Sequence, residues 1–139
     1  MNDKSLIYIS IFKRKGGEGL NTKVINNNNK NCYIHLLNEL RENEKPLIVY
    51  YKNTLNYFIL TNFRIINCYS GNQCIINLND IIEVQLALKE EFNDRVMDKE
   101  KFTRLKIKTK SNDYFILNLE EGKPYQGLYQ VLHFIVMNN

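Results

Sequence analysis

Four basic residues stand at every second position over 104–110, and they are the residues of this chain best suited to bind another molecule. They are Arg104, Lys106, Lys108 and Lys110. In a β-strand this spacing places all four on one face, about 6.7 Å apart. Such a row would attract an anionic surface, an acidic peptide or a phosphate backbone. The alternative is an ordinary solvated face, whose charges pair with acidic residues such as Glu83 on a neighbouring strand.

Groups that could catalyse a reaction or bind a metal are few. The two histidines are His35 and His133, and no acidic residue stands beside His133 to orient it as a general base. The three cysteines form no Cys-x-x-Cys pair and fit reduced thiols packed as small apolar residues. The acidic residues between 89 and 101 lack the alternate spacing and the central glycine of an EF-hand. We therefore expect a protein that is not an enzyme and has no metal site and no cofactor.

The net charge of the chain, +4, belongs to its first 30 residues, which hold six Lys or Arg and two acidic residues. An apolar stretch, Ile7–Phe12, is followed by Lys13-Arg14-Lys15, and together they would suit an anionic membrane surface. The alternative is a solvated N-terminus. Because the glycines of 16–19 and the asparagines of 26–29 bury no apolar area, we expect residues 1–31 to be a basic, partly disordered leader.

Residues 32–139 are expected to form one domain, which agrees with a total length of 139 residues. A helix is predicted over 32–43, because apolar residues recur there at helical spacing and Pro46 ends the segment. Seven strands are predicted between 47 and 119, joined mostly by turns of hairpin length. A last helix is predicted over 123–137, where Pro124 lies at its first turn and a continuous apolar stripe follows.

The stripe of the last helix must cover apolar surface, and an antiparallel sheet that curls on itself leaves an open end for it. The predicted fold class is therefore α+β, a seven-stranded antiparallel β-barrel or sandwich capped by the C-terminal helix, with an extra N-terminal helix. The outer face of the capping helix carries no charge and would suit a partner or self-association, unless Phe134 only widens the buried stripe. This face consists of Gln126, Gln130, His133, Phe134 and Met137.

Seven strands followed by one capping helix is the element order of the pleckstrin-homology (PH) fold. Residues 57–66, Tyr-Phe-Ile-Leu-Thr-Asn-Phe-Arg-Ile-Ile, resemble the "tyrosine–hydrophobic–leucine–threonine–asparagine–x–arginine" strand pair of bacterial PH-like domains. The stretch Asp80-Ile81-Ile82-Glu83-Val84 resembles the "aspartate–isoleucine–x–x–valine" segment that follows it in that family. The resemblance spans roughly residues 32–137 and leaves the leader uncovered.

The resemblance implies a non-catalytic scaffold that binds a protein, a peptide or a lipid headgroup. Lipid-binding members use clustered basic residues between the first two strands, where this chain offers only Lys52, so phosphoinositide binding is not expected. We predict a cytoplasmic adaptor module for a protein or peptide partner, since the longest apolar runs are too short to span a membrane. The alternative is a peripheral membrane module that uses the basic leader and the Arg104–Lys110 strand face. Nucleic-acid binding is not expected, because no aromatic residue interleaves that row for base stacking.

Overall fold

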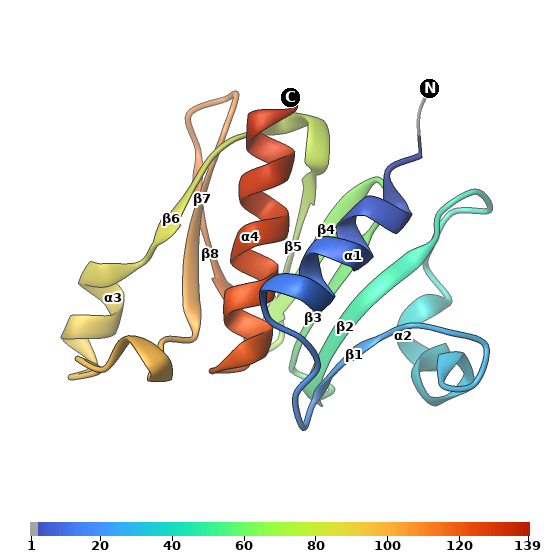
Figure 1. The fold of residues 1–139 in the computed structure, drawn as a ribbon, viewed down its shortest axis with the longest axis horizontal. Coiled ribbons are helices and arrows are strands. Elements are labelled where there is room, and N and C mark those ends of the chain that lie inside the picture. The colour runs from blue at the N-terminus through green and yellow to red at the C-terminus, as the bar shows by residue number, and fades with distance from the viewer. Residues whose placement is uncertain (1–2) are drawn as a thin grey trace.

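The computed structural model describes residues 3–139, which form two antiparallel sheets with helices packed against them (Figure 1). The first sheet contains β1 (Thr22–Val24), β2 (Pro46–Asn53), β3 (Asn56–Thr61), β4 (Arg64–Tyr69) and β5 (Asn72–Asn77), in this order. The second sheet contains β6 (Ile81–Leu86), β7 (Arg104–Thr109) and β8 (Tyr114–Asn118). The α-helices are α1 (Ser5–Lys15), α2 (Ile34–Leu37), α3 (Leu88–Asn93) and α4 (Lys123–Met137). Short 3-10 turns occupy Lys30–Tyr33, Leu78–Asp80 and Lys99–Lys101.

The seven strands predicted between 47 and 119 are present as β2 to β8, and β1 is an additional edge strand beside β2. Local sequence explains them. The turn between β4 and β5 has positive φ angles at Ser70 and Gly71, as a tight hairpin turn with the twist of its strands requires. In β7, Leu105 and Ile107 are buried and alternate with more exposed Arg and Lys side chains, so that strand has one core face.

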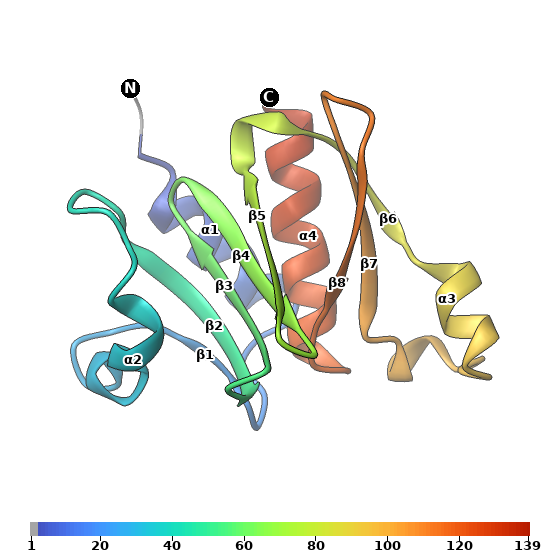
Figure 2. The ribbon, with the colours of Figure 1, turned by 180° about the vertical axis from the view of Figure 1, so that it is seen from behind.

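Of the predicted β-barrel or sandwich, the barrel is wrong, because the two sheets are not joined by strand pairing at either side. After β5 the chain turns through Leu78–Asp80 and starts the second sheet without returning to the edge of the first. The strand β8 instead lies against β3 and β4. The result is an open pair of sheets with a shared apolar core, and a seam remains where the edge of β5 faces that of β8 (Figure 2).

The helix α4 covers the open side of this pair of sheets, as predicted for residues 123–137. Its stripe of Leu128, Val131, Leu132 and Ile135 is almost completely buried in the core between the sheets. Burial of such a stripe is the main source of stability for an amphipathic helix. None of the helices within residues 3–139 is both long enough and apolar enough to cross a membrane.

Residues 1–31 were predicted to be a basic, partly disordered leader, and within them Ser5–Lys15 form the helix α1 beside α4 (Figure 1). Tyr8, Ile11 and Phe12 recur at helical spacing and are buried, with Phe12 completely inaccessible. The two helices approach closely at Gly127, where an added Cβ atom would lie 2.7 Å from Cδ1 of Phe12. The leader therefore contributes a helix to the core of the domain.

The helix predicted over 32–43 is much shorter in the structure, where α2 spans only Ile34–Leu37 and follows the 3-10 turn at Lys30–Tyr33. The apolar residues of the predicted helix nevertheless pack against the same surface. They pack on the outer face of the first sheet over Val49, Ile59 and Ile66. These residues are Tyr33, Leu36, Leu37 and Leu40. The chain after Leu37 is held in an irregular path by contacts of Glu44, which override local helix propensity.

Candidate functional site

The seam between β5 and β8 brings together one edge strand of each sheet. Each strand is the last of its sheet, so alternate backbone N–H and C=O groups have no partner in the ladder. Soluble proteins usually protect such edges with charges, proline or bulges. Within the described chain, neither β5 nor β8 contains a charged residue or proline, and the pairing of each with its neighbour is regular. The seam is thus suited to accept an extended segment as an added strand.

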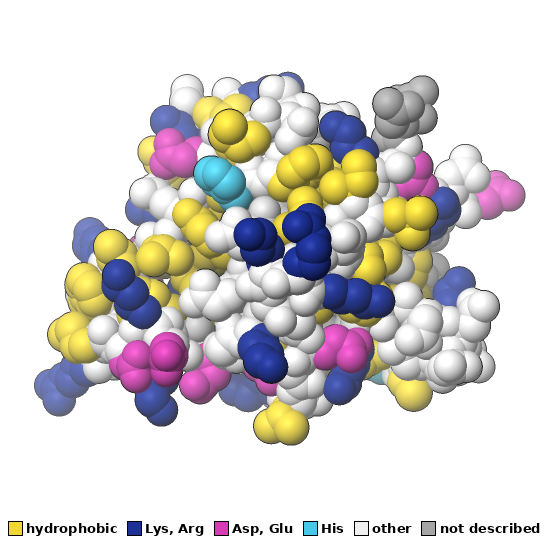
Figure 3. Space-filling model, viewed as in Figure 1, with side chains coloured by type: hydrophobic (Ala, Val, Ile, Leu, Met, Phe, Trp, Pro, Cys, Tyr) yellow, Lys and Arg dark blue, Asp and Glu magenta, His cyan; other side chains and the backbone are white. Residues whose placement is uncertain are grey.

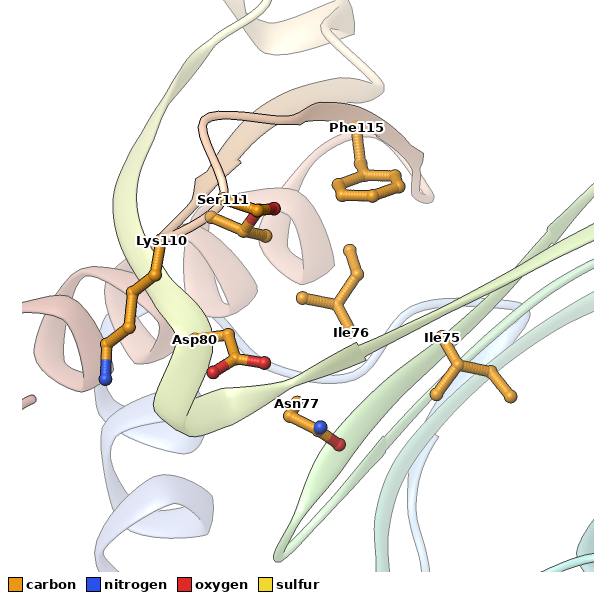
Figure 4. Close-up of a pocket in the computed structure, with 8 residues that line it drawn as sticks. Ile75, Ile76, Asn77, Asp80, Lys110, Ser111 and Phe115 are labelled. Atoms are coloured by element: carbon orange, nitrogen blue, oxygen red, sulfur yellow. The ribbon is translucent and has the colours of Figure 1, made fainter.

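A cavity of about 320 Å³ opens on the seam near the end of β5 and the start of β8. Ile76 and Phe115 point toward one another across it (Figure 4). Asp80 and Ser111 line its polar side, and Lys110, which also lines the cavity, extends its side chain away from Ile76 and Phe115 (Figure 4). The apolar floor with a mixed polar rim would fit an apolar side chain whose backbone stays near the strand edges.

A second cavity, of about 330 Å³, opens on the seam near the start of β5 and the end of β8, where the strands lie closest in Figure 2. Asn67 of β4 lines it and is only 3% exposed. Its Nδ2 donates to the carbonyl oxygen of Ile116 at 3.5 Å, while its Oδ1 has no hydrogen-bond partner among the described residues. The buried Oε1 of Glu90, which lines the same cavity, likewise accepts no hydrogen bond from residues 3–139.

Two orphaned acceptors in one cavity are unusual, because a buried polar group that lacks a partner costs about 1–3 kcal/mol. Cys74 stands opposite Asn67 in the register of β4 and β5 and also lines the cavity. Burial raises the pKa of the Cys74 thiol, so this group adds no negative charge at neutral pH. The residues that line the cavity thus carry two oxygen acceptors that have no donor within the described chain.

Arg104, the first residue of the predicted basic row, is already engaged within the protein. Its Nη1 donates to Oε1 of the fully buried Glu91 at 2.9 Å, and its Nη2 pairs with Asp94. The other carboxylate oxygen of Glu91 accepts from the backbone N–H of Thr103 at 2.7 Å. These contacts attach α3 to the start of β7 and offset the charge of Arg104.

The remaining members of the row are Lys106, Lys108 and Lys110. Lys106 and Lys108 extend over the ring of Tyr114, with Nζ atoms 5.0 and 5.6 Å from its centroid. Lys110 is exposed. Glu83 stands opposite Lys108 in the register of β6 and β7, although no ion pair joins them in the described chain. Lys106 and Lys108 are thus half-buried on the side of β7 opposite Leu105 and Ile107, and the exposed Lys110 follows them in the turn after β7.

The residues of the predicted partner face of α4 lie in different environments. Phe134 packs edge-on against Tyr8 of α1, with ring centroids 6.2 Å apart, and so widens the buried stripe. His133 stacks on Tyr129 within the same helix. The other members are Gln126, which is exposed, Gln130, which is half-buried, and Met137, which is exposed.

The helices α1 and α4 together form a basic surface, which we call the α1–α4 surface. Within the described chain neither helix contains an acidic residue. Lys13, Arg14, Lys15 and Lys123 lie on it, and Leu6 of α1 is 82% exposed. Figure 3 shows Lys and Arg side chains gathered over the two helices. A cavity of about 550 Å³, lined by Arg14, Lys15 and Lys123, lies between the end of α1 and the start of α4.

A buried polar cluster joins the segment before β2 to the end of β3 and the start of β4, and it was not predicted from the sequence. Arg64 donates from Nε to Oε2 of Glu44 at 2.8 Å and from Nη2 to Oε1 at 3.0 Å. Thr61 donates to Oε2 of Glu44 at 2.6 Å. Thr61 and Arg64 belong to the threonine–asparagine–x–arginine motif, and this motif is the sequence feature that could have indicated the cluster. The cluster fixes the segment before β2 to the β3–β4 turn and is structural.

No group of three or more His, Cys, Asp or Glu side chains within residues 3–139 is arranged to hold a metal ion. Comparisons of the chain with protein-family models, curated proteins and solved structures give no match. The function is therefore inferred from the geometry of the seam and of the α1–α4 surface.

Proposed function

We propose that this protein is a non-enzymatic, PH-like binding module that holds an extended segment of a protein partner along the seam between β5 and β8. Four strands from β2 to β5, three from β6 to β8 and a final helix follow the element order of PH-like domains. The motif of residues 57–66 occupies β3, the turn after it and the start of β4, as the resemblance implies. These features support the family assignment within the proposal.

The observation that carries the proposal is the pair of unprotected strand edges with a cavity at each end of the seam. An extended peptide would gain main-chain hydrogen bonds from the edge of β5, and alternate side chains would enter the cavities. Ile75 of β5 is 49% exposed and stands opposite Ile66, so it lies on the outer face of this edge strand. An adaptor needs such a groove and no catalytic group.

Selection from a random peptide library displayed on phage tests the proposal. The protein with Ile75→Lys carries a charge on the edge of β5, and the matched control Ile82→Lys carries it on the edge of β6, where Ile82 is 41% exposed. Selected peptides should bind the Ile75→Lys variant at least roughly tenfold more weakly than the wild type and leave the control unchanged. Equal binding to all three proteins would exclude the seam as the binding site.

The α1–α4 surface supports a second candidate function, which is attachment to an anionic membrane surface. Exposed Leu6 and Ile7 stand on the same helix as Lys13, Arg14 and Lys15, so apolar insertion and charge attraction would act together. The Arg104–Lys110 row does not extend this surface. Within β7 its basic side chains lie on the face opposite Leu105 and Ile107, which face the core shared with α4, and Lys110 lies in the turn after this strand.

Sedimentation with vesicles of phosphatidylcholine, with and without phosphatidylserine, tests this second candidate. The double variant Lys13→Glu, Arg14→Glu should abolish any salt-sensitive binding to the anionic vesicles. The control Lys89→Glu, Lys99→Glu makes the same change of charge on and beside α3 and should retain binding. Absence of binding by the wild type at low salt would remove this candidate.

A further inference from the structure

We infer that the cavity lined by Asn67 and Glu90 binds a cationic side chain, lysine or arginine, of the extended segment that occupies the seam. This inference rests on the proposed function of the seam, and it assigns the chemistry of one position of the partner. The site is built by residues from β4, β5, β8 and α3, which meet only in the folded chain.

The hydrogen-bonding groups of the cavity favour a cationic side chain. Oδ1 of Asn67 and Oε1 of Glu90 are both buried and both lack a donor among residues 3–139. The ligand group that satisfies both must supply N–H or O–H donors. A guanidinium carries five N–H donors and an ammonium three, and neither has an acceptor. Charge-assisted bonds of this kind are the stronger ones, so the lysine or arginine would gain more than a neutral donor.

The charges around the cavity also favour a cation. Arg104 lines the cavity, but Glu91 and Asp94 already bind its guanidinium. Glu90 lines the cavity as well, so Arg104 alone stands against the three acidic residues Glu90, Glu91 and Asp94, which leaves a surplus of negative charge. Lys106 is the next basic residue along β7, and its ammonium lies over Tyr114. Tyr114 stands diagonally across from Lys106 on β8, on the side away from Arg104. A cationic ligand would offset this surplus.

The cavity also lies within reach of a segment that pairs with β5. The cavity opens beside Gln73 and Cys74 of β5 and beside Ile116 and Asn118 of β8. A segment added to the edge of β5 would carry one of its side chains into this cavity and, farther along, another toward Ile76 and Phe115. The partner is therefore expected to alternate a basic and an apolar residue on one face.

Titration of the labelled protein with n-butylguanidinium, followed by NMR, tests the site without a peptide. We expect saturable shifts of the side-chain amide of Asn67 and of the backbone amides of Cys74 and Glu90. The neutral analogue n-butylurea should bind at least roughly tenfold more weakly. Glu90→Gln should weaken guanidinium binding by a similar factor, whereas the control Glu83→Gln, exposed on β6, should not. Equal shifts with both probes, or none at these residues, would overturn the inference.

A second variant separates loss of the site from loss of the fold. Asn67→Leu removes the orphaned acceptor, so it should abolish guanidinium binding while the protein unfolds at an unchanged or higher urea concentration. Retained binding by this variant would count against the site. In the peptide selection, peptides that depend on Ile75 but show no fixed basic residue would overturn this inference and leave the proposed function standing. Absence of Ile75-dependent peptides would instead contradict the proposed function.

Discussion

Arg64 and Glu44 form a two-point ion pair in the interior of the protein, through Nε and Nη2 of the guanidinium at 2.8 and 3.0 Å from the two carboxylate oxygens. The Glu44 side chain is completely inaccessible, and that of Arg64 is 10% exposed. Thr61 adds a third bond to the same carboxylate. The pair ties the irregular segment before β2 to the β3–β4 turn, residues that are separated by 20 positions in the chain.

Replacement of Arg64 by alanine should lower the free energy of unfolding by about 3–5 kcal/mol, because a buried carboxylate would lose its partner. Urea unfolding at neutral pH measures the change. The control Lys45→Ala removes a solvent-exposed ion pair with Asp3 and should cost roughly 0–1 kcal/mol. Similar losses of unfolding free energy in the two variants would show that the buried pair contributes no more to stability than the exposed one.

Stability should fall in acid through the same carboxylate. Burial opposes ionisation of Glu44, but hydrogen bonds from Arg64, Thr61 and the backbone outweigh it and lower its pKa below the ordinary value of 4.5. The resulting stabilisation is complete above pH 4.5 and is lost as the pH falls through the lower folded pKa. The difference in unfolding free energy between the wild type and Glu44→Gln should therefore shrink below pH 4.5. A difference that is independent of pH would contradict this assignment.

The helix α1 should behave as part of the core. Phe12→Ala should lower the free energy of unfolding by about 3–5 kcal/mol, because Phe12 is completely buried and its removal leaves a cavity. The control Leu6→Ala, at a position 82% exposed on the same helix, should have little effect. Urea unfolding and limited proteolysis of the N-terminal segment measure both. Equal sensitivity of the two variants to protease would mean that α1 is not docked.

The contact between α1 and α4 should tolerate no side chain at Gly127. An added Cβ would lie 2.7 Å from Cδ1 and 2.9 Å from the carbonyl oxygen of Phe12, so Gly127→Ala must push the helices apart. We expect a net loss of about 1–2 kcal/mol, since overpacking outweighs the gain in helix propensity. Hydrogen exchange should become faster in α1. The control Ser10→Ala, exposed on α1, should show neither effect.

Local periodicity explains which elements could be predicted. Residues 123–137 carry one apolar stripe, and Leu105 and Ile107 alternate with basic residues, so the helix α4 and the strand β7 follow from the sequence. The N-terminal segment gave no such pattern, because nearly every residue from Leu6 to Phe12 is apolar. Which of them are buried depends on α4, more than 100 positions away in the chain.

The candidate site could not be predicted in the same way. Four basic residues at alternate positions indicated one charged strand face, but only the folded chain brings Glu91 and Asp94 to Arg104. The approach of Asn67 to Ile116 and Glu90 likewise depends on how the two sheets are placed against one another. Neither relationship leaves a periodic signal along the chain.

By itself, the sequence determined the strand-rich α+β class and the C-terminal helix, because burial of one face leaves a repeat of two or 3.6 residues. The tertiary structure decided that the sheets stay open, that α1 joins the core and that unpaired acceptors lie along the seam. The physical reason is that these features arise from contacts between distant segments, whose energies depend on geometry in space rather than on the order of neighbouring residues.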